Sequence, residues 1–326
     1  MRLIKRLRSM SKKRLARATA ALVPLVLVGA AAPEERRLPR DARVNVIVNG
    51  DVVRAQVVAG LPNLLVIAPN SRLRLRLRQE FDDDTAYLRI FGRRTLSGRV
   101  RDVSLLVDDQ LRRSEVYWFS RPLIEGAEAT LGPLMFVQPR VTFPLEGAEA
   151  GPLSRYRFKL LGGPRTVAGT MLDDHGQPFL TLFNLEQPRD YPLASAALGA
   201  HLARHYGGTL SGPSWDSEIV FGIKRPVRWL TLARPVRFGP IILSKLAVRV
   251  RDRVDGSGTG AGRIREADEP VDLEEVTVEA GRRGPRPIYS LSLPRALLAP
   301  CARLTFDKRA RQIELVCPAG TRLAAG

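Results

Sequence analysis

The chain has 326 residues, of which 44% are hydrophobic, so it is long enough for two domains and is not of disordered composition. Its formal net charge is +19; eight basic residues and no acid lie in residues 1–32, which leaves 19 − 8 = +11 on the rest. A basic field favours anionic partners such as lipid head groups, nucleic acid or acidic polysaccharide, although arginine also serves solubility. The 27 glycines and 24 prolines are spread along the chain, a pattern typical of many short strands joined by turns.

Residues 1–32 have the pattern of a targeting segment. Basic residues precede an apolar run from Ala18 to Ala32, which ends in small residues. The run is short for a membrane span and ends as a cleavable signal peptide does. We therefore expect export to a periplasm, with the segment removed, and an N-terminal inner-membrane anchor is the alternative. Residues 33–42 are charged and contain proline, and they are predicted to form a linker.

The first half of the body, residues 43–150, reads as a series of strands. Val44 to Val58 alternates around a Gly50-Asp51 turn, which predicts a hairpin. Ser71–Arg78 alternates leucine with arginine and predicts a strand with one solvated basic face. That face has no interleaved aromatic residues for base stacking, so no specific nucleic acid is expected. Further strands are predicted at Tyr87–Phe91, Arg99–Val107 and Glu115–Phe119, with a domain boundary at 147–152.

The second half, residues 155–318, has the same character with one clear helix. Ala196–His205 is helical in pattern, with Ser195 as N-cap and Gly207 as the stop. Residues 252–285 are glycine-rich and then acidic, and we interpret them as an insertion in this half. The predicted strands are Tyr156–Leu161, Val167–Leu172, Pro178–Asn184, Val227–Leu232 and Ile242–Val250.

Metal and cofactor motifs are weak. His201 and His205 lie four residues apart, but Leu202 stands where a zinc helix carries glutamate, and His175 is expected in a turn. We predict no metal site. Gly256-x-Gly258-x-Gly260 is followed by polar and acidic residues rather than a helix, so no dinucleotide cofactor is expected. No Gly-x-Ser-x-Gly nucleophile motif occurs.

The two cysteines are predicted to form a disulfide. Cys301 and Cys317 flank a strand–turn–strand pattern, and folding it about Arg309 places the two cysteines opposite each other. An oxidising compartment would maintain the bond, and two separate buried thiols are the alternative.

A near-repeat organises the chain. Arg140–Phe143 and Arg303–Phe306 read Arg-Val-Thr-Phe and Arg-Leu-Thr-Phe, and each closes a block that opens with a glycine hairpin, at Val44–Gly50 and Thr170–Gly176. This layout resembles the pepsin-like and retropepsin-like aspartic peptidases, especially bacterial periplasmic relatives. The resemblance implies an all-β, two-lobed acid-protease-like β-barrel architecture with one or two short helices per lobe. The segments that carry it are Val46–Val57, Leu64–Pro69, Leu131–Phe143, Pro178–Phe183, Ser195–His205, Leu293–Leu298 and Arg303–Asp307.

The catalytic motif of that family is degenerate in both lobes. Val58, Ala59 and Gly60 stand where the first Asp-Thr-Gly would be, and Asn184, Leu185 and Glu186 stand at the second, in a register open by one or two residues. The family uses two carboxylates that share one proton, and valine can neither hold a proton nor accept a hydrogen bond. No catalytic residue is therefore assigned. The remaining carboxylates of the hairpin turns, Asp51, Asp173 and Asp174, are expected to face solvent.

Three functions follow from this pattern. The first is a catalytically inactive exported protein that binds a peptide or envelope partner in the cleft between lobes by strand-type hydrogen bonds. The second is an active peptidase with a relocated carboxylate. The third is a basic envelope protein that binds an anionic polymer or membrane surface. The sequence leaves the oligomeric state open.

Overall fold

The computed structural model describes residues 34–74, 77, 84–89, 95–162, 167–250 and 288–325, without the side chains of residues 84–97. The predicted targeting segment 1–32 and insertion 252–285 lie outside the described residues. Residues 33–326 group into one compact unit, and the predicted lobes 43–150 and 155–318 stay a prediction. In the described part of the chain, no helix combines the length and apolar character needed to cross a membrane.

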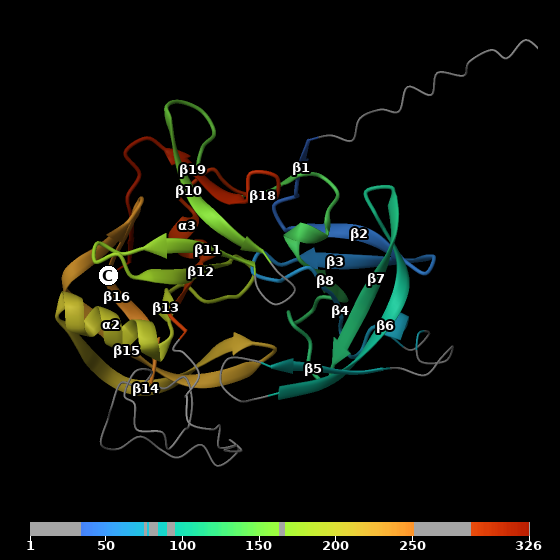
Figure 1. The fold of residues 1–326 in the computed structure, drawn as a ribbon, viewed down its shortest axis with the longest axis horizontal. Coiled ribbons are helices and arrows are strands. Elements are labelled where there is room, and N and C mark those ends of the chain that lie inside the picture. The colour runs from blue at the N-terminus through green and yellow to red at the C-terminus, as the bar shows by residue number, and fades with distance from the viewer. Residues whose placement is uncertain are drawn as a thin grey trace, which may run out of the picture. The chain divides into compact units, whose positions relative to one another are not determined.

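Strands dominate the described chain, which confirms the all-β fold class (Figure 1). The first half contains β1 (Glu35–Arg37), β2 (Arg43–Val48), β3 (Asp51–Val57), β4 (Leu65–Ile67), β5 (Asp84–Arg89), β6 (Thr95–Val107), β7 (Gln110–Phe119), β8 (Ala129–Leu131), η1 (Pro133–Met135) and β9 (Arg140–Pro144). The second contains β10 (Leu153–Gly162), β11 (Val167–Leu172), β12 (Pro178–Asn184), β13 (Leu193–Ala194), α2 (Ala196–Tyr206), β14 (Gly208–Val220), β15 (Ile223–Phe238), β16 (Ile241–Arg249), β17 (Ser290–Pro294), α3 (Arg295–Leu298), β18 (Arg303–Asp307), β19 (Gln312–Pro318) and β20 (Leu323–Ala325).

Six strands of the first half close into a barrel. The pairing runs β2-β3-β8-β4-β7-β6 and returns from β6 to β2, while β5 extends β6. Alternation explains the inner face, because Val44, Val46 and Val48 of β2 are buried between exposed or half-buried neighbours. The barrel therefore leaves β3 ending at Val57, directly before the first motif segment.

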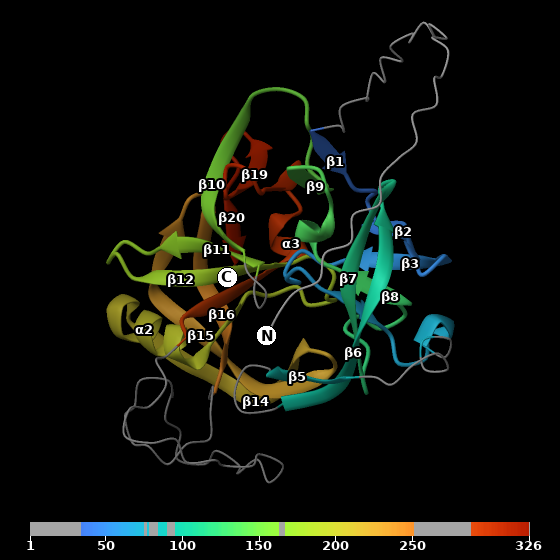
Figure 2. The same cartoon turned by 45° about the vertical axis from the view of Figure 1, so that its right-hand side comes forward.

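The other strands form one large sheet, which links the two halves of the chain. Its order is β1-β9-β18-β19-β10-β11-β12-β17-β13-β16-β15-β14, with β20 on β16. Helix α2 lies beside β15 and the long β14–β15 hairpin (Figure 2). Segment 33–42, predicted as a linker, instead contributes β1, which pairs with β9, and buries Leu38.

The two halves of the near-repeat contain equivalent elements in the same order. Strands β2 and β3 have six and seven residues, and so do β11 and β12. The last residue of β3 pairs in parallel with β8, and the last residue of β12 pairs in parallel with β17. A short helix then precedes β9 in one half and β18 in the other, and these two strands pair with each other. Val57 and Asn184 are thus equivalent positions.

One predicted strand is helical. Residues 72–74 and 77 are helical, not extended, and both Leu73 and Leu77 are buried. The leucines repeat at two-residue and four-residue spacing alike, and the four-residue spacing places two of them on one helix face. The Ser71 hydroxyl accepts a hydrogen bond from the Leu73 backbone N–H, at 3.3 Å, as a residue at a helix start does.

Candidate functional site

The structure brings the two motif segments together. Both follow the equivalent strands β3 and β12, and the backbone N–H of Ala59 donates to Oε1 of Glu186 at 2.9 Å. Gly60 also approaches the second segment, since a Cβ on it would lie 3.7 Å from the carbonyl oxygen of Phe183. A side chain 127 positions away in the sequence therefore joins the two loops.

Glu186 is the carboxylate at this junction. Its Oε2 accepts a hydrogen bond from the backbone N–H of Leu185, at 3.1 Å. Burial raises the pKa of Glu186 to about 7, although the N–H of Ala59 and the charge of Arg295 act in the opposite direction. Near neutral pH this side chain is thus divided between its acid and its carboxylate forms.

Val58 stands in an apolar environment. It is 8% exposed and belongs to a hydrophobic cluster that also contains Leu61, Val66, Phe119, Leu123, Phe221 and Ile223. Phe119 and Phe221 meet edge to face in this cluster, with ring centroids 5.2 Å apart. Val58, the first residue of the first degenerate motif, is therefore part of a small core.

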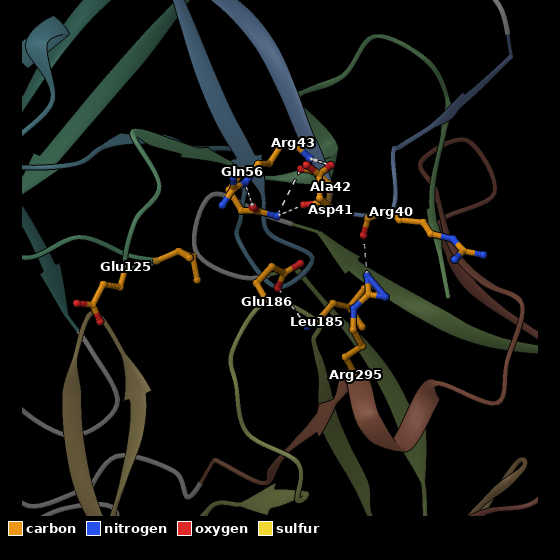
Figure 3. A pocket seen from close by; sticks show the side chains of 10 residues that line it. Arg40, Asp41, Ala42, Arg43, Gln56, Glu125, Leu185, Glu186 and Arg295 are labelled. Carbon is orange, nitrogen blue, oxygen red and sulfur yellow. Dashed lines mark hydrogen bonds between the residues drawn. The ribbon is translucent and has the colours of Figure 1, made fainter. Parts of the chain in front are cut away.

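A polar pocket of about 300 Å³ lies at the Glu186 side of the junction. Arg295 holds one wall, because its guanidinium donates to the carbonyl oxygens of Pro144 at 3.4 Å and Arg40 at 3.2 Å. In Figure 3 the Glu125 carboxylate is turned away from Glu186, on the opposite side of the pocket from Arg40. The lining residues are Arg40, Asp41, Ala42, Arg43, Gln56, Ile124, Glu125, Leu185, Glu186 and Arg295.

Sequence reasoning identified Leu185 and Glu186 among these pocket residues and missed the others. Asp41 lies in the segment expected to be a linker, and Gln56 is one of many polar residues on a strand. Gln56 donates to the carbonyl oxygen of Asp41 at 2.9 Å, so it fixes the chain entering β2. These residues come together only in the folded chain, where the β2–β3 pairing places Arg43 opposite Gln56.

The side chain of Asn184 stabilises the second loop through hydrogen bonds. Its Nδ2 donates to Oε1 of Gln187 at 2.6 Å and to Oγ of Ser292 at 3.4 Å. The same Ser292 hydroxyl accepts from Arg189 at 2.7 Å. These contacts tie the residues on both sides of Glu186 to β17, which fixes where the carboxylate lies.

The hairpin-turn aspartates take different roles. Asp173, expected to face solvent, is buried instead. Its Oδ1 accepts hydrogen bonds from the backbone N–H groups of His175 and Gln177, and its Oδ2 pairs with His201. Asp174 is exposed and accepts the Tyr206 hydroxyl at 2.6 Å, a bond that lowers the pKa of Asp174. Asp51 begins β3.

The chain's histidines lie together, which the sequence did not indicate. The ring centroids of His175 and His205 are 4.8 Å apart, and those of His201 and His205 are 4.4 Å apart. Within the described ranges, no three His, Cys, Asp or Glu side chains are arranged to hold a metal ion.

Cys301 and Cys317 form the predicted disulfide. The register differs by one residue from the expected one, because Arg303 pairs with Val316 and a four-residue turn separates Asp307 from Gln312. Cys317 therefore lies past the residue opposite Arg303, and Cys301 reaches it from the bend after α3.

Comparisons with known proteins give a distant structural likeness to solved structures and no match by sequence. No protein-family profile and no curated protein matches the sequence. The chain is similar in structure to the EIAV protease complexed with the inhibitor HBY-793, at 11% sequence identity and a TM-score of 0.22, over 29% of this chain and 84% of that chain.

Proposed function

We propose that this protein is an exported, acid-protease-like binding protein that holds an extended peptide beside Glu186 without cleaving it. The observation that carries the proposal is the Ala59–Glu186 hydrogen bond of 2.9 Å. It joins the two loops that would supply a catalytic pair, but the junction is made of one carboxylate and backbone N–H groups.

The equivalence of β3 and β12 supports a specific register. Val57 and Asn184 end equal strands, so Val58, Ala59 and Gly60 correspond to Leu185, Glu186 and Gln187. In this register Val58 and Leu185 replace both catalytic aspartates, and Glu186 stands opposite Ala59. The register moves the second motif by one residue from Asn184–Glu186.

The chemistry of Glu186 also favours binding. Hydrolysis by a carboxylate pair requires one group to activate water while the other polarises the carbonyl. Both oxygens of Glu186 accept backbone N–H groups and so serve to hold the loops. A peptide can still add strand-type hydrogen bonds beside the pocket, whose charged residues would select its polar side chains.

The test is a binding and cleavage assay on the purified mature protein. Fluorescent peptides from an unbiased library are measured by anisotropy, and the same mixtures are analysed by mass spectrometry from pH 2 to 8. We expect saturable binding and intact peptides, with binding weakened in Arg295→Ala and retained in the surface control Arg309→Ala. Absence of any binding would contradict the proposal.

A second candidate function is hydrolysis with Glu186 as a single general base. The pKa of about 7 favours it, because a base is most effective when its pKa lies near the working pH. Cleavage that is lost in Glu186→Gln and kept in Glu125→Gln, which changes the other side of the pocket, would establish this candidate and overturn the first.

A further inference from the structure

All three histidines of the chain meet at one place on the large sheet. His201 and His205 lie one turn apart on α2, and His175 lies in the turn of the β11–β12 hairpin. The His205 ring is within 5 Å of both others, with centroids at 4.4 Å from His201 and 4.8 Å from His175. The cluster therefore joins the hairpin tip to the last turns of the helix.

Hydrogen bonds to two aspartates complete the junction. Oδ2 of Asp173 is 2.6 Å from Nε2 of His201, and the Asp173 side chain is fully buried. Oδ1 of Asp174 accepts the Tyr206 hydroxyl at 2.6 Å. The hairpin tip is thus held to α2 by two carboxylates and by the packing of imidazole rings.

The charged groups around the three histidines determine how the junction responds to low pH. The helix contributes Arg204, and β15 contributes Arg234, which donates to the carbonyl oxygen of His205 at 2.6 Å. Tyr289 adds a ring edge against His201, with centroids 5.9 Å apart. At neutral pH the two arginines balance Asp173 and Asp174, whereas three protonated imidazoles leave an excess of three positive charges.

We infer that His175, His201 and His205 form an acid-sensitive latch, which fastens the β11–β12 hairpin to α2 at neutral pH and releases it when the imidazoles are protonated. Protonation of His201 alone strengthens its pair with Asp173. Protonation of His205 then places a like charge with its ring centroid 4.4 Å from that of His201, and protonation of His175 places another 4.8 Å from that of His205. The repulsion between these charges opens the junction. This device does not depend on what the pocket beside Glu186 binds.

The pKa of His205 agrees with this geometry. Desolvation lowers it, and the neighbouring His201, His175 and Arg204 lower it further, against the opposing charge of Asp173. A histidine with a depressed pKa binds protons more readily when its surroundings open. Its contribution to the closed state is therefore present above the ordinary pKa of about 6.5 and is lost as the pH falls through its lowered value.

Hydrogen–deuterium exchange of the full mature chain tests the latch, in buffers with EDTA at pH 7.5 and 5.5 and with correction for intrinsic exchange. We expect amides of residues 173–177 and of the last turn of α2 to exchange at least about tenfold faster at pH 5.5, because opening of the junction exposes them to solvent. The double variant His175→Gln/His205→Gln should lose this acceleration, and Glu186→Gln should keep it. Equal acceleration in the double variant would overturn the inference.

A second measurement covers the case in which the double variant does not fold. Because the chain has three histidines, the imidazole Cε1–H region of an NMR spectrum of the wild type contains three signals to titrate. We expect the signal of His205 to titrate below the ordinary histidine value of about 6.5 and to respond to protonation of the neighbouring imidazoles. Three independent titrations near the ordinary histidine value would contradict the latch.

Discussion

Thr142 and Thr305 place their hydroxyl oxygens 2.8 Å apart, where β9 and β18 pair. They occupy the same position of the two near-repeats, and both side chains are buried. The following phenylalanines, Phe143 and Phe306, also meet, edge to face with centroids 5.7 Å apart. The two halves of the chain are therefore joined through equivalent residues, as an approximate two-fold relationship requires.

This hydroxyl pair predicts a measurable coupling. Thr142→Val and Thr305→Val each leave the other buried hydroxyl without this partner. We expect each single variant to lower the free energy of unfolding by about 1–3 kcal/mol, the cost of a buried polar group that has lost its hydrogen bond. Urea unfolding of both variants and the double variant measures the coupling, and strictly additive effects would count against a direct bond.

Two glycines near the site should respond differently to alanine. A Cβ on Gly132 would lie 2.1 Å from the Pro62 carbonyl oxygen and 2.4 Å from that of Leu61, so the 58–62 loop would have to move. A Cβ on Gly60 would lie 3.7 Å from the Phe183 carbonyl oxygen, an ordinary van der Waals contact. We expect Gly132→Ala to lower stability by roughly 1–3 kcal/mol, as overpacking does, and Gly60→Ala to change it little. Thermal unfolding compares them, and equal losses would show that the loop is not held by this contact.

The disulfide should stabilise the folded protein by reducing the conformational entropy of the unfolded chain. Cys301 and Cys317 are separated by 16 positions, and a loop of this size gives about 3 kcal/mol in the chain-entropy description. Reduction of the wild type should lower the urea midpoint accordingly, and Cys301→Ala/Cys317→Ala should be insensitive to reductant. Two titratable thiols in unfolded, non-reduced protein would contradict the bond.

Sequence patterns located the elements whose signals are local. The strands Val167–Leu172 and Pro178–Asn184 have the predicted bounds, and Ser195 and Gly207 cap α2 as expected, with the Ser195 hydroxyl accepting from Leu198 and Gly207 left-handed. Each of these signals depends on neighbours a few positions away. The bounds of these elements follow from local sequence preferences, which the tertiary contacts do not override here.

The errors concern features that only the fold decides. Leucines spaced by two also include a pair spaced by four, so Leu73 and Leu77 fit a helix face as well as a strand face. Asp173 was expected in solvent because its partner His201 lies 28 positions away. Glu186 was identified as a motif residue, but its contact with Ala59 could not be read from a register that was open by one or two positions.

Restoring one aspartate should not create an enzyme. Val58→Asp would place a carboxylate in the apolar cluster with Phe119 and Ile223, and Leu185 would still stand at the equivalent position of the second loop. An uncompensated buried charge costs about 3–5 kcal/mol, so we expect lower stability and no peptide cleavage. Val58→Leu, which keeps the apolar character, is the matched control. Inhibitor-sensitive cleavage by Val58→Asp would show that Glu186 can act as the second carboxylate.

Glu186 should make stability fall as the pH rises. Its pKa is about 7 in the folded protein against about 4.5 for an ordinary glutamate, so the folded state binds the proton more tightly between these values. The stabilising contribution is complete below about pH 4.5 and is lost as the pH rises through about 7, at no more than about 1.4 kcal/mol per pH unit. This direction is opposite to that of the histidine cluster.

The difference between wild type and Glu186→Gln isolates this contribution, because both proteins keep the histidines. Glutamine does not titrate, and it also sets an amide NH₂ against one backbone N–H, which lowers its stability at every pH by a nearly constant amount. Urea unfolding from pH 4.5 to 8 should therefore show the wild type losing its advantage over Glu186→Gln as the pH rises. Glu125→Gln, across the same pocket, should follow the wild-type curve. A constant difference between wild type and Glu186→Gln over this range would mean that the carboxylate is ionised throughout, and that a charged rather than a protonated side chain joins the two loops.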